Sequence, residues 1–370
     1  MLTLQEEPVE EVPMSQFILY PEAQEAIPAL EPHSVIGLDT EFMRERTYFA
    51  ELCLVQVAAG TQLTGIDPLL NDDQAPFWNA LADREWVVHS ARQDLEVIYQ
   101  THAVLPATLF DTQVAAGLAG YAPQLGYAGL VKELFAKELP KTHTRANWAK
   151  RPLPDALLEY AAEDVEYLLP IREALADRLD ALGRLDWAMA DSALLLDHSL
   201  YDTDVGNAVE RVKAARGLRG RRRVAASLLA GWREERAIRI NKPRQWILRD
   251  NVLVEIATRL PQSVSALKAI PDMPPRVAQR SGSELLTLVE RSGREETAYR
   301  PPPAPDEAQK ALLKKMQAIV ASVAGDLGLA NEVVASRKEL SAVIIRNDRD
   351  SRVFQDWRRE LIGDELLALL

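Results

Sequence analysis

Cysteine is almost absent from this sequence, since Cys53 is the only one in 370 residues. An intramolecular disulfide and a zinc site built from several cysteines are therefore excluded, which suits a reducing compartment. Cys53 lies in the apolar run Leu52–Val57, where we expect a buried and unreactive thiol.

Two kinds of targeting segment are also missing. The first residues are acidic and contain proline, with neither a basic segment nor an apolar core, so no secretory signal is expected. No uninterrupted apolar run approaches the length that spans a membrane. We therefore expect a soluble, cytoplasmic protein, and the sequence implies neither a membrane nor a stable protein partner.

Lysine and arginine are absent from residues 1–31, and the whole chain has a net charge of −12. This average argues against a nucleic-acid partner, yet residues 210–259 contain fourteen Lys or Arg against five Asp or Glu. A basic stretch in an acidic protein is typical of a surface that contacts phosphates. We expect RNA contact there, above all at Arg221, Arg222 and Arg223; pairing with the acidic N-terminal arm is the alternative.

The hydrophobic pattern separates an α/β part from a helical part. Short β-rich runs alternate with helical ones over residues 35–111, which predicts a sheet flanked by helices. After Leu125 the pattern is helical, with one long helix expected from about Pro154 to Leu182. The predicted strands are Val35–Asp39, Leu52–Ala58, Leu63–Asp67, Trp86–His89 and Thr108–Asp111.

A chain of 370 residues exceeds what one core usually holds, so we expect several domains. A helix, loop and helix follow one another from Trp232 to Asn251, and a proline-rich stretch precedes the last helical segment. The expected parts are a flexible acidic arm (1–15), an α/β domain (16–205), a helical domain (209–291), a linker (292–305) and a second helical domain (306–370).

Three separate motifs offer carboxylates that suit divalent metal ions. Asp39 and Glu41 lie two apart at the end of an apolar strand, so they face the same side. Asp94 falls in the early turns of a helix, and Tyr160 and Asp164 lie four apart on another helix. Each motif alone has a structural alternative, namely a solvated turn, a helix cap or an acidic helix face.

The order of these motifs resembles the DEDD exonuclease superfamily, in its tyrosine-bearing branch. The resemblance implies two divalent metal ions, Mg²⁺ or Mn²⁺, bound by Asp39, Glu41, Asp94 and Asp164. It also implies that Tyr160 orients the attacking water. Activity should then require added metal.

Further segments are similar to the ribonuclease D family, including Leu38–Phe42, Leu109–Thr112 and Trp148–Leu153. The resemblance implies a ribonuclease H-like α/β exonuclease domain with a mixed sheet flanked by helices. Residues 210–290 resemble the HRDC domain shared by RecQ-type helicases and ribonuclease D, and residues 306–370 resemble a degenerate second copy.

The resemblance implies a 3′-5′ exoribonuclease that releases nucleoside 5′-monophosphates and trims tRNA precursors and other small structured RNAs. The alternatives are a DNA 3′-5′ exonuclease and a non-catalytic RNA-binding protein. Besides the arginine cluster, the candidate substrate contacts are Phe42, His89, Lys141, Arg145 and Arg151. For His89, a hydrogen-bonded core position is the alternative.

Overall fold

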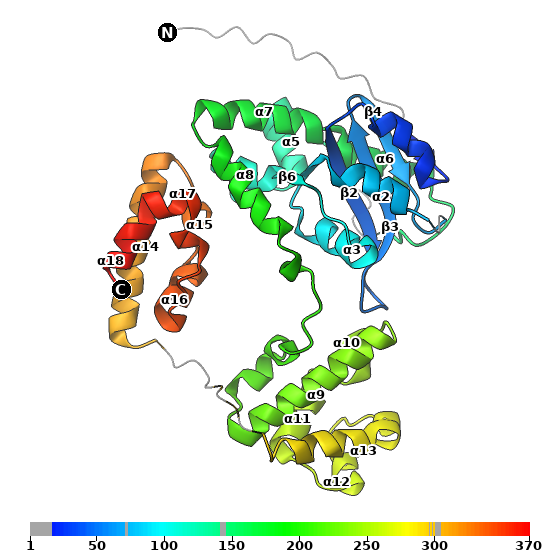
Figure 1. Cartoon of the computed structure of the whole chain (residues 1–370), viewed down its shortest axis with the longest axis vertical. Coiled ribbons are helices and arrows are strands. Elements are labelled where there is room, and N and C mark those ends of the chain that lie inside the picture. The colour runs from blue at the N-terminus through cyan, green and yellow to red at the C-terminus, as the bar shows by residue number, and fades with distance from the viewer. Residues whose placement is uncertain (1–16, 71–72, 141–145, 296, 298, 300–304) are drawn as a thin grey trace. The chain divides into compact units, whose positions relative to one another are not determined.

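The computed structural model describes residues 17–70, 73–140, 146–295, 297, 299 and 305–370. The chain forms two compact units (Figure 1). The first unit contains Met1–Met43, Leu52–Tyr201 and Pro305–Leu370, and the second contains Arg44–Glu51 and Asp202–Ala304. Within the described part of the chain, none of the helices combines the length and apolar character needed to span a lipid bilayer.

A six-stranded mixed sheet forms the centre of the first unit. Its strands are β1 (Phe17–Tyr20), β2 (Val35–Met43), β3 (Glu51–Ala59), β4 (Gln62–Ile66), β5 (Glu85–Val88) and β6 (Thr108–Asp111). Their order is β1-β4-β3-β2-β5-β6. Strands β3 and β4 pair antiparallel, whereas β1–β4, β2–β5 and β5–β6 are parallel. The five predicted strands are confirmed, and the four-residue β1 was not predicted.

Helices lie on both faces of this sheet (Figure 1). They are α1 (Ile27–Leu30), α2 (Ala75–Ala82), α3 (Arg92–His102), α4 (Thr112–Leu118), α5 (Tyr127–Phe135), α6 (Asp155–Glu166), α7 (Leu168–Ala181) and α8 (Leu185–Ala193). Central strand β3 is buried along almost its whole length, including Cys53 as predicted. Because both of its faces are covered, β3 reads as a continuous apolar run rather than an alternating one.

The prediction of one long helix over 154–182 is wrong, because the helix breaks at Tyr167 between α6 and α7. The hydroxyl of Tyr127 accepts a hydrogen bond from Tyr167 N at 3.0 Å and donates to Glu163 O at 2.8 Å. These two backbone groups would bond each other in a continuous helix, so the hydroxyl is inserted between them. Pro170, which has no N–H, also leaves the carbonyl of Glu166 without its helical donor.

The C-terminal segment packs against α8 within the first unit. Its helices are α14 (Glu307–Leu327), α15 (Asn331–Val334), α16 (Arg337–Arg346), α17 (Asp356–Arg358) and α18 (Asp364–Ala368). The ring of Trp357 stacks on Trp187 with centroids 4.5 Å apart, and Arg358 donates two hydrogen bonds to Asp191 at 2.6 and 2.7 Å. A bidentate pair fixes the orientation of both partners.

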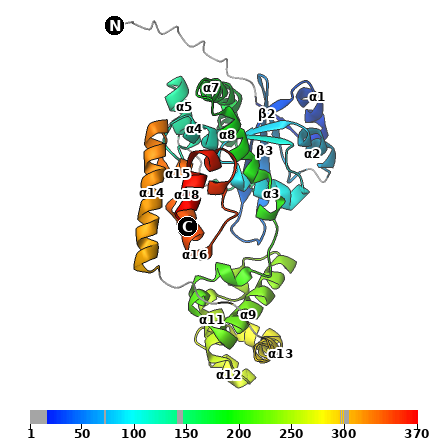
Figure 2. The same ribbon diagram turned by 60° about the vertical axis from the view of Figure 1, so that its left-hand side comes forward.

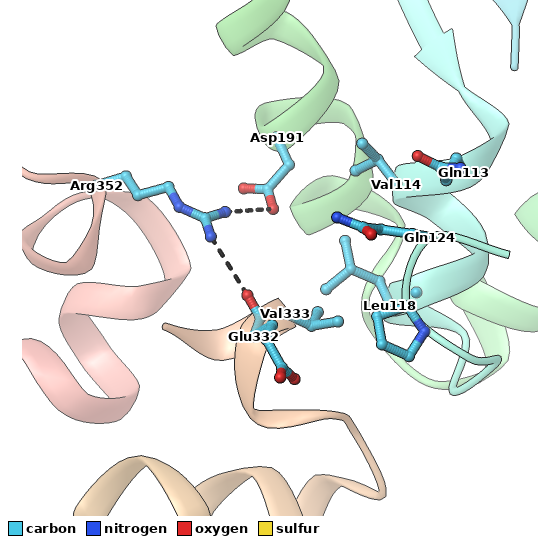
Figure 3. Close-up of a pocket in the computed structure, with 10 residues that line it drawn as sticks. Gln113, Val114, Leu118, Gln124, Asp191, Glu332, Val333 and Arg352 are labelled. Atoms are coloured by element: carbon cyan, nitrogen blue, oxygen red, sulfur yellow. Dashed lines mark hydrogen bonds and ion pairs between the residues drawn. The ribbon is translucent and has the colours of Figure 1, made fainter. Parts of the chain in front are cut away.

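A cavity of about 310 Å³ lies beside this contact, lined by residues of α4, α8 and α15 (Figure 3). Arg352 borders it and reaches both Asp191, at 3.7 Å, and the backbone oxygen of Glu332, at 3.5 Å. Its guanidinium also pairs with Glu339. These polar groups are committed to one another, so they hold the C-terminal segment in place around the cavity.

The regular secondary structure in the described part of residues 202–304 of the second unit is helical (Figure 2). They are α9 (Gly220–Arg239), α10 (Arg244–Ile247), α11 (Asp250–Arg259), α12 (Val264–Lys268) and α13 (Pro275–Arg291), so the predicted succession of helix, loop and helix is confirmed. Arg233 on α9 is fully buried and donates to Leu248 O and to Asp250. This pair fixes the turn between α10 and α11.

The loop between β2 and β3 belongs to the second unit, not to the sheet that it connects. The hydroxyl of Tyr48 donates to the buried Glu234 at 2.6 Å. The side-chain oxygen of Asn241 accepts from the backbone N–H groups of Tyr48 and Phe49, at 2.9 and 3.1 Å. Residues 44–51 are therefore held by the end of α9 and the turn after it.

Candidate metal and catalytic site

Strand β2 presents Asp39 and Glu41 on the face of the sheet that α6 and α7 cover. Gly37, Asp39 and Glu41 alternate along the strand and share this face. A Cβ on Gly37 would lie 2.9 Å from the Cβ of Leu168 on α7, so glycine lets the helix approach closely. The two carboxylates therefore face the helix pair.

Helix α6 contributes the third carboxylate, Asp164. One oxygen from each of Asp39, Glu41 and Asp164 can be chosen so that all three lie within 4.8 Å of one another. Tyr160, one turn earlier on α6, is hydrogen-bonded to Asp164. The structure thus brings a strand motif and a helix motif together, although more than 100 residues separate them in the sequence.

Asp94 lies in the first turn of α3 and is buried, with 8% of its surface exposed. The hydroxyl of Thr40, which stands between the two strand carboxylates, donates to Asp94 at 2.5 Å. Asp94 is not one of the three carboxylates that come within 4.8 Å of one another. Its charge nevertheless raises the pKa of Asp39, Glu41 and Asp164.

All four carboxyl groups have raised pKa values. The pKa of Glu41 rises from 4.5 to about 8, because burial removes water from the carboxylate and because Asp164 and Asp94 carry like charge. Burial, again the largest cause, raises the pKa of Asp94 to about 6 and that of Asp164 to about 7. The pKa of Asp39 lies well above its ordinary value, first through burial and then through the neighbouring acids.

This donor set fits a divalent cation. Oxygen ligands are what Mg²⁺ and Mn²⁺ prefer, and several carboxylates in a small buried volume repel one another until positive charge neutralises them. Hydrogen bonding to the Tyr160 hydroxyl and the Thr40 hydroxyl fixes two of the four carboxylates. The residues present are therefore suited to binding a divalent metal ion.

His89 follows β5 and comes level with Asp39, because Gly37 pairs with Val87 in the parallel register. Its Nδ1 lies 2.9 Å from the hydroxyl of Thr112, and its ring meets Tyr127 edge-on. Nε2 is buried and has no hydrogen-bond partner within the described residues. Burial lowers the pKa of His89, so the imidazole is neutral near pH 7.

Arg151 was predicted as a substrate contact, and its guanidinium is instead used inside the domain. It pairs with Asp67, which is 2% exposed, and donates to the carbonyl oxygens of Cys53 and Trp148 at 2.6 and 2.5 Å. The ring of Trp148 in turn lies 6.2 Å from that of Tyr160. Arg151 thus supports the wall behind Tyr160 rather than offering a free cation.

The predicted arginine cluster is only partly available to a ligand. Arg223 is buried, pairs with Glu210 and lies 3.8 Å over the ring of Tyr299. Arg221 and Arg222 are both exposed, although Arg221 also donates to Val289 O at 3.1 Å. Phe42, at the end of β2, is half-buried, and Lys141 and Arg145 lie outside the described residues.

Asp111 is a positioning residue that the sequence analysis did not identify. Its carboxylate accepts hydrogen bonds from four backbone N–H groups, those of Ser90 and Ala91 before α3 and those of Gln113 and Val114 in α4. It thereby fixes the turn that leads to Asp94 on α3. An aspartate directly before a helical pattern is an N-cap signal and would have revealed half of this role.

Comparison with known proteins agrees with this site. A family model described as a 3′-5′ exonuclease matches residues 20–180, and an HRDC domain model matches residues 223–289. The ribonuclease D of Gluconacetobacter diazotrophicus is 38% identical over 90% of this chain and 87% of its own length. That of Acidiphilium cryptum is 36% identical over 92% and 88%.

A solved structure is also similar over nearly the whole chain. The crystal structure of Escherichia coli RNase D, described as an exoribonuclease involved in structured RNA processing, superimposes with a TM-score of 0.87. The two chains are 28% identical, and the match covers 96% of this chain and 98% of that one. With the acidic site in place and these relatives matching along its length, this chain belongs to the ribonuclease D family and is a 3′-5′ exoribonuclease.

Proposed function

We propose that the enzyme removes nucleotides from RNA 3′ ends with two divalent metal ions, Mg²⁺ or Mn²⁺, and releases nucleoside 5′-monophosphates. The observation that supports this most directly is the group formed by Asp39, Glu41 and Asp164, whose oxygens converge within 4.8 Å. When bound, the metal ions would supply an activated water and stabilise the negative charge that develops on the phosphate.

The residues that would hold the metal ions in this proposal are Asp39, Glu41, Asp94 and Asp164. In this proposal Tyr160 acts as a neutral hydrogen-bonding group. Burial and the nearby acids raise its pKa well above the ordinary value, so the phenol keeps its proton over the whole working pH range. A hydroxyl held by Asp164 can orient a water molecule for attack. On the basis of this role of Tyr160 we place the enzyme, as part of the same proposal, in the tyrosine-bearing DEDD branch.

We also propose the following division of the chain: an acidic arm at 1–15, the exonuclease domain at 16–205, an HRDC domain at 209–291, a linker at 292–305 and a degenerate second HRDC-like domain at 306–370. The 3′ ends of tRNA precursors and other small structured RNAs are the proposed substrates. The relative from E. coli, which acts on structured RNA, supports this choice.

A 5′-labelled tRNA with an unpaired 3′ extension tests the proposal. In the presence of Mg²⁺ or Mn²⁺, the wild-type enzyme should produce a ladder that shortens from the 3′ end. Asp39→Asn removes one charge and one proposed metal ligand at almost unchanged volume, so the variant should bind the RNA without shortening it. Full activity of this variant would refute the assigned ligands.

The same assay separates the alternatives. Equal degradation of a DNA strand of identical sequence would favour a DNA exonuclease. Binding without any shortening by the wild-type enzyme would favour an RNA-binding protein. Chromatography of the released products tests which P–O bond of the phosphodiester is cleaved. Nucleoside 5′-monophosphates are the expected species.

A further inference from the structure

A hollow of about 160 Å³ lies on the surface of the HRDC-matched region, where α10 and α13 both pack against α9. Two indole rings and three guanidinium groups line it: Trp232, Trp246, Arg236, Arg276 and Arg280. It lies in the second unit and shares no residue with the carboxylate site. Aromatic rings interleaved with arginines are the combination that single-stranded nucleic acids use.

Trp246 is an exposed side chain of this hollow, with 61% of its surface accessible. It stands on the four-residue helix α10, whose next residue, Ile247, is 8% exposed and belongs to the core of the second unit. The backbone N–H of Trp246 donates to Pro243 O at 2.8 Å. The base of the side chain is thus fixed while the ring remains accessible, in the same hollow as Arg236, Arg276 and Arg280.

The arginine side chains around the ring of Trp246 give the hollow a strong positive charge. Arg276 and Arg280 lie four apart on α13, so they share one face of that helix, and both are exposed. Arg236 lies 5.7 Å over the ring of Trp232 and 3.9 Å from Glu284. Residues 236–249, which include α10, contain five Lys or Arg and no Asp or Glu.

We propose that this hollow binds an unpaired stretch of RNA, with one base stacked on Trp246 and the neighbouring phosphates contacting Arg276 and Arg280. The proposal rests on RNA being the substrate, as argued above. A base offers a planar face to the indole, and its phosphate offers negative charge within one nucleotide of that face. An acidic peptide would satisfy the arginines but would leave the planar ring without a matching partner.

Such a site gives the substrate a hold that the acidic catalytic site cannot provide. The carboxylate cluster repels phosphates unless metal is bound, whereas this hollow attracts them. A strand long enough to reach both sites gains from the second contact through effective concentration. The enzyme should therefore bind long unpaired 3′ extensions more tightly than short ones.

Binding of a fluorescently labelled, unstructured RNA of about 12 nucleotides, measured by anisotropy in the inactive Asp39→Asn background, tests the stacking contact. Trp246→Ala and Trp246→Leu should each weaken binding by about tenfold, since a base stacked on an aromatic ring contributes about that much. Trp246→Phe should keep most of the affinity. Circular dichroism and thermal unfolding show whether each variant is folded.

The charge contacts have a separate signature. Arg276→Gln combined with Arg280→Gln should lower the slope of log K against log salt by about 1.4, because each lost phosphate contact on a single strand contributes about 0.7. Trp246→Ala should leave this slope unchanged. Lys268→Gln on α12 removes a charge elsewhere in the same domain and is the matched control; it should change neither affinity nor slope.

The proposal would be overturned if folded Trp246→Ala bound the single-stranded RNA as tightly as the wild type does. It would also be overturned if this variant lost as much affinity for a blunt RNA duplex as for the single strand. Either result leaves the exoribonuclease assignment intact, provided that the wild-type enzyme shortens RNA. A different result would separate the two proposals. If the wild-type enzyme never shortens RNA but the variants at Trp246, Arg276 and Arg280 still weaken RNA binding, the proposed function fails and the binding site in the hollow stands.

Discussion

Replacing Glu41 with glutamine should stabilise the metal-free protein while abolishing its activity. The substitution keeps the shape of the side chain and removes its charge from the carboxylate cluster. In the folded metal-free protein the pKa of Glu41 is about 8, against 4.5 in an unfolded chain. A carboxyl group with a raised pKa favours folding at low pH, and this contribution is lost as the pH rises through the folded-state value.

The size of the effect follows from the interval between these pKa values. At pH 7 Glu41 is ionised in the unfolded chain but not in the folded protein. Each pH unit between 4.5 and 7 destabilises the folded protein by about 1.36 kcal/mol, so the upper limit of the destabilisation at pH 7 is about 3 kcal/mol. Glu41 is partly exposed, and screening by water reduces this to about 1–2 kcal/mol. For a unit of this size, the midpoint of thermal unfolding should rise by roughly 3–8 °C.

Thermal unfolding in the presence of a chelator, followed from pH 4.5 to pH 8, measures this difference. The two proteins should unfold at the same temperature near pH 4.5 and diverge as the pH rises. Saturating Mg²⁺ should reverse the order, because metal stabilises the form that binds it. A constant difference at all pH values, or none, would show that folding does not raise the pKa of Glu41, and would refute the reasoning.

Three further predictions concern the surroundings of the site. Tyr127→Phe removes the hydroxyl inserted between Glu163 O and Tyr167 N, so the free energy of unfolding should fall by about 1–3 kcal/mol, as chemical denaturation would measure. Turnover should also fall because Asp164 shifts, and steady-state kinetics would measure this. Arg151→Met leaves the buried Asp67 without its ion-pair partner and should destabilise the protein by about 3 kcal/mol. In a double-mutant cycle, the additional change Asp67→Asn should recover part of this stability. Removal of metal with a chelator should stop RNA shortening at pH 8, and added Mg²⁺ or Mn²⁺ should restore it; activity that survives the chelator would contradict the metal assignment.

The sequence predicted what depends on local patterns. The apolar residues 35–38 predicted a strand there, and the alternation of side chains along it places Asp39 and Glu41 on one face of β2. The spacing of Tyr160 and Asp164 likewise places both on one face of α6. The break at Tyr167 was only partly predictable: Pro170 is a local signal that interrupts a helix, but the hydroxyl inserted at the break comes from Tyr127, 40 residues earlier in the chain.

Long-range pairs account for the other differences. Arg151 appeared in a basic segment before α6, yet its partner Asp67 lies 84 residues away and turns a candidate RNA contact into an internal support. Arg223 likewise read as part of a dense basic cluster, and only the fold reveals that Glu210 and Tyr299 surround it. Charge counts along a chain do not distinguish a paired cation from a free one.

Asn241 and Glu234 hold the β2–β3 loop by hydrogen bonds. Residues 44–51 therefore belong to the second unit, although the strands on either side of them belong to the first. A fragment ending near residue 201 would carry this loop without the groups that accept its hydrogen bonds, exposing the ring of Tyr48. Such a fragment would be a poor stand-in for the enzyme in truncation studies. Exchange of HRDC domains between relatives would succeed only if residues 44–51 were transferred with them, so these two distant segments are expected to change together during evolution.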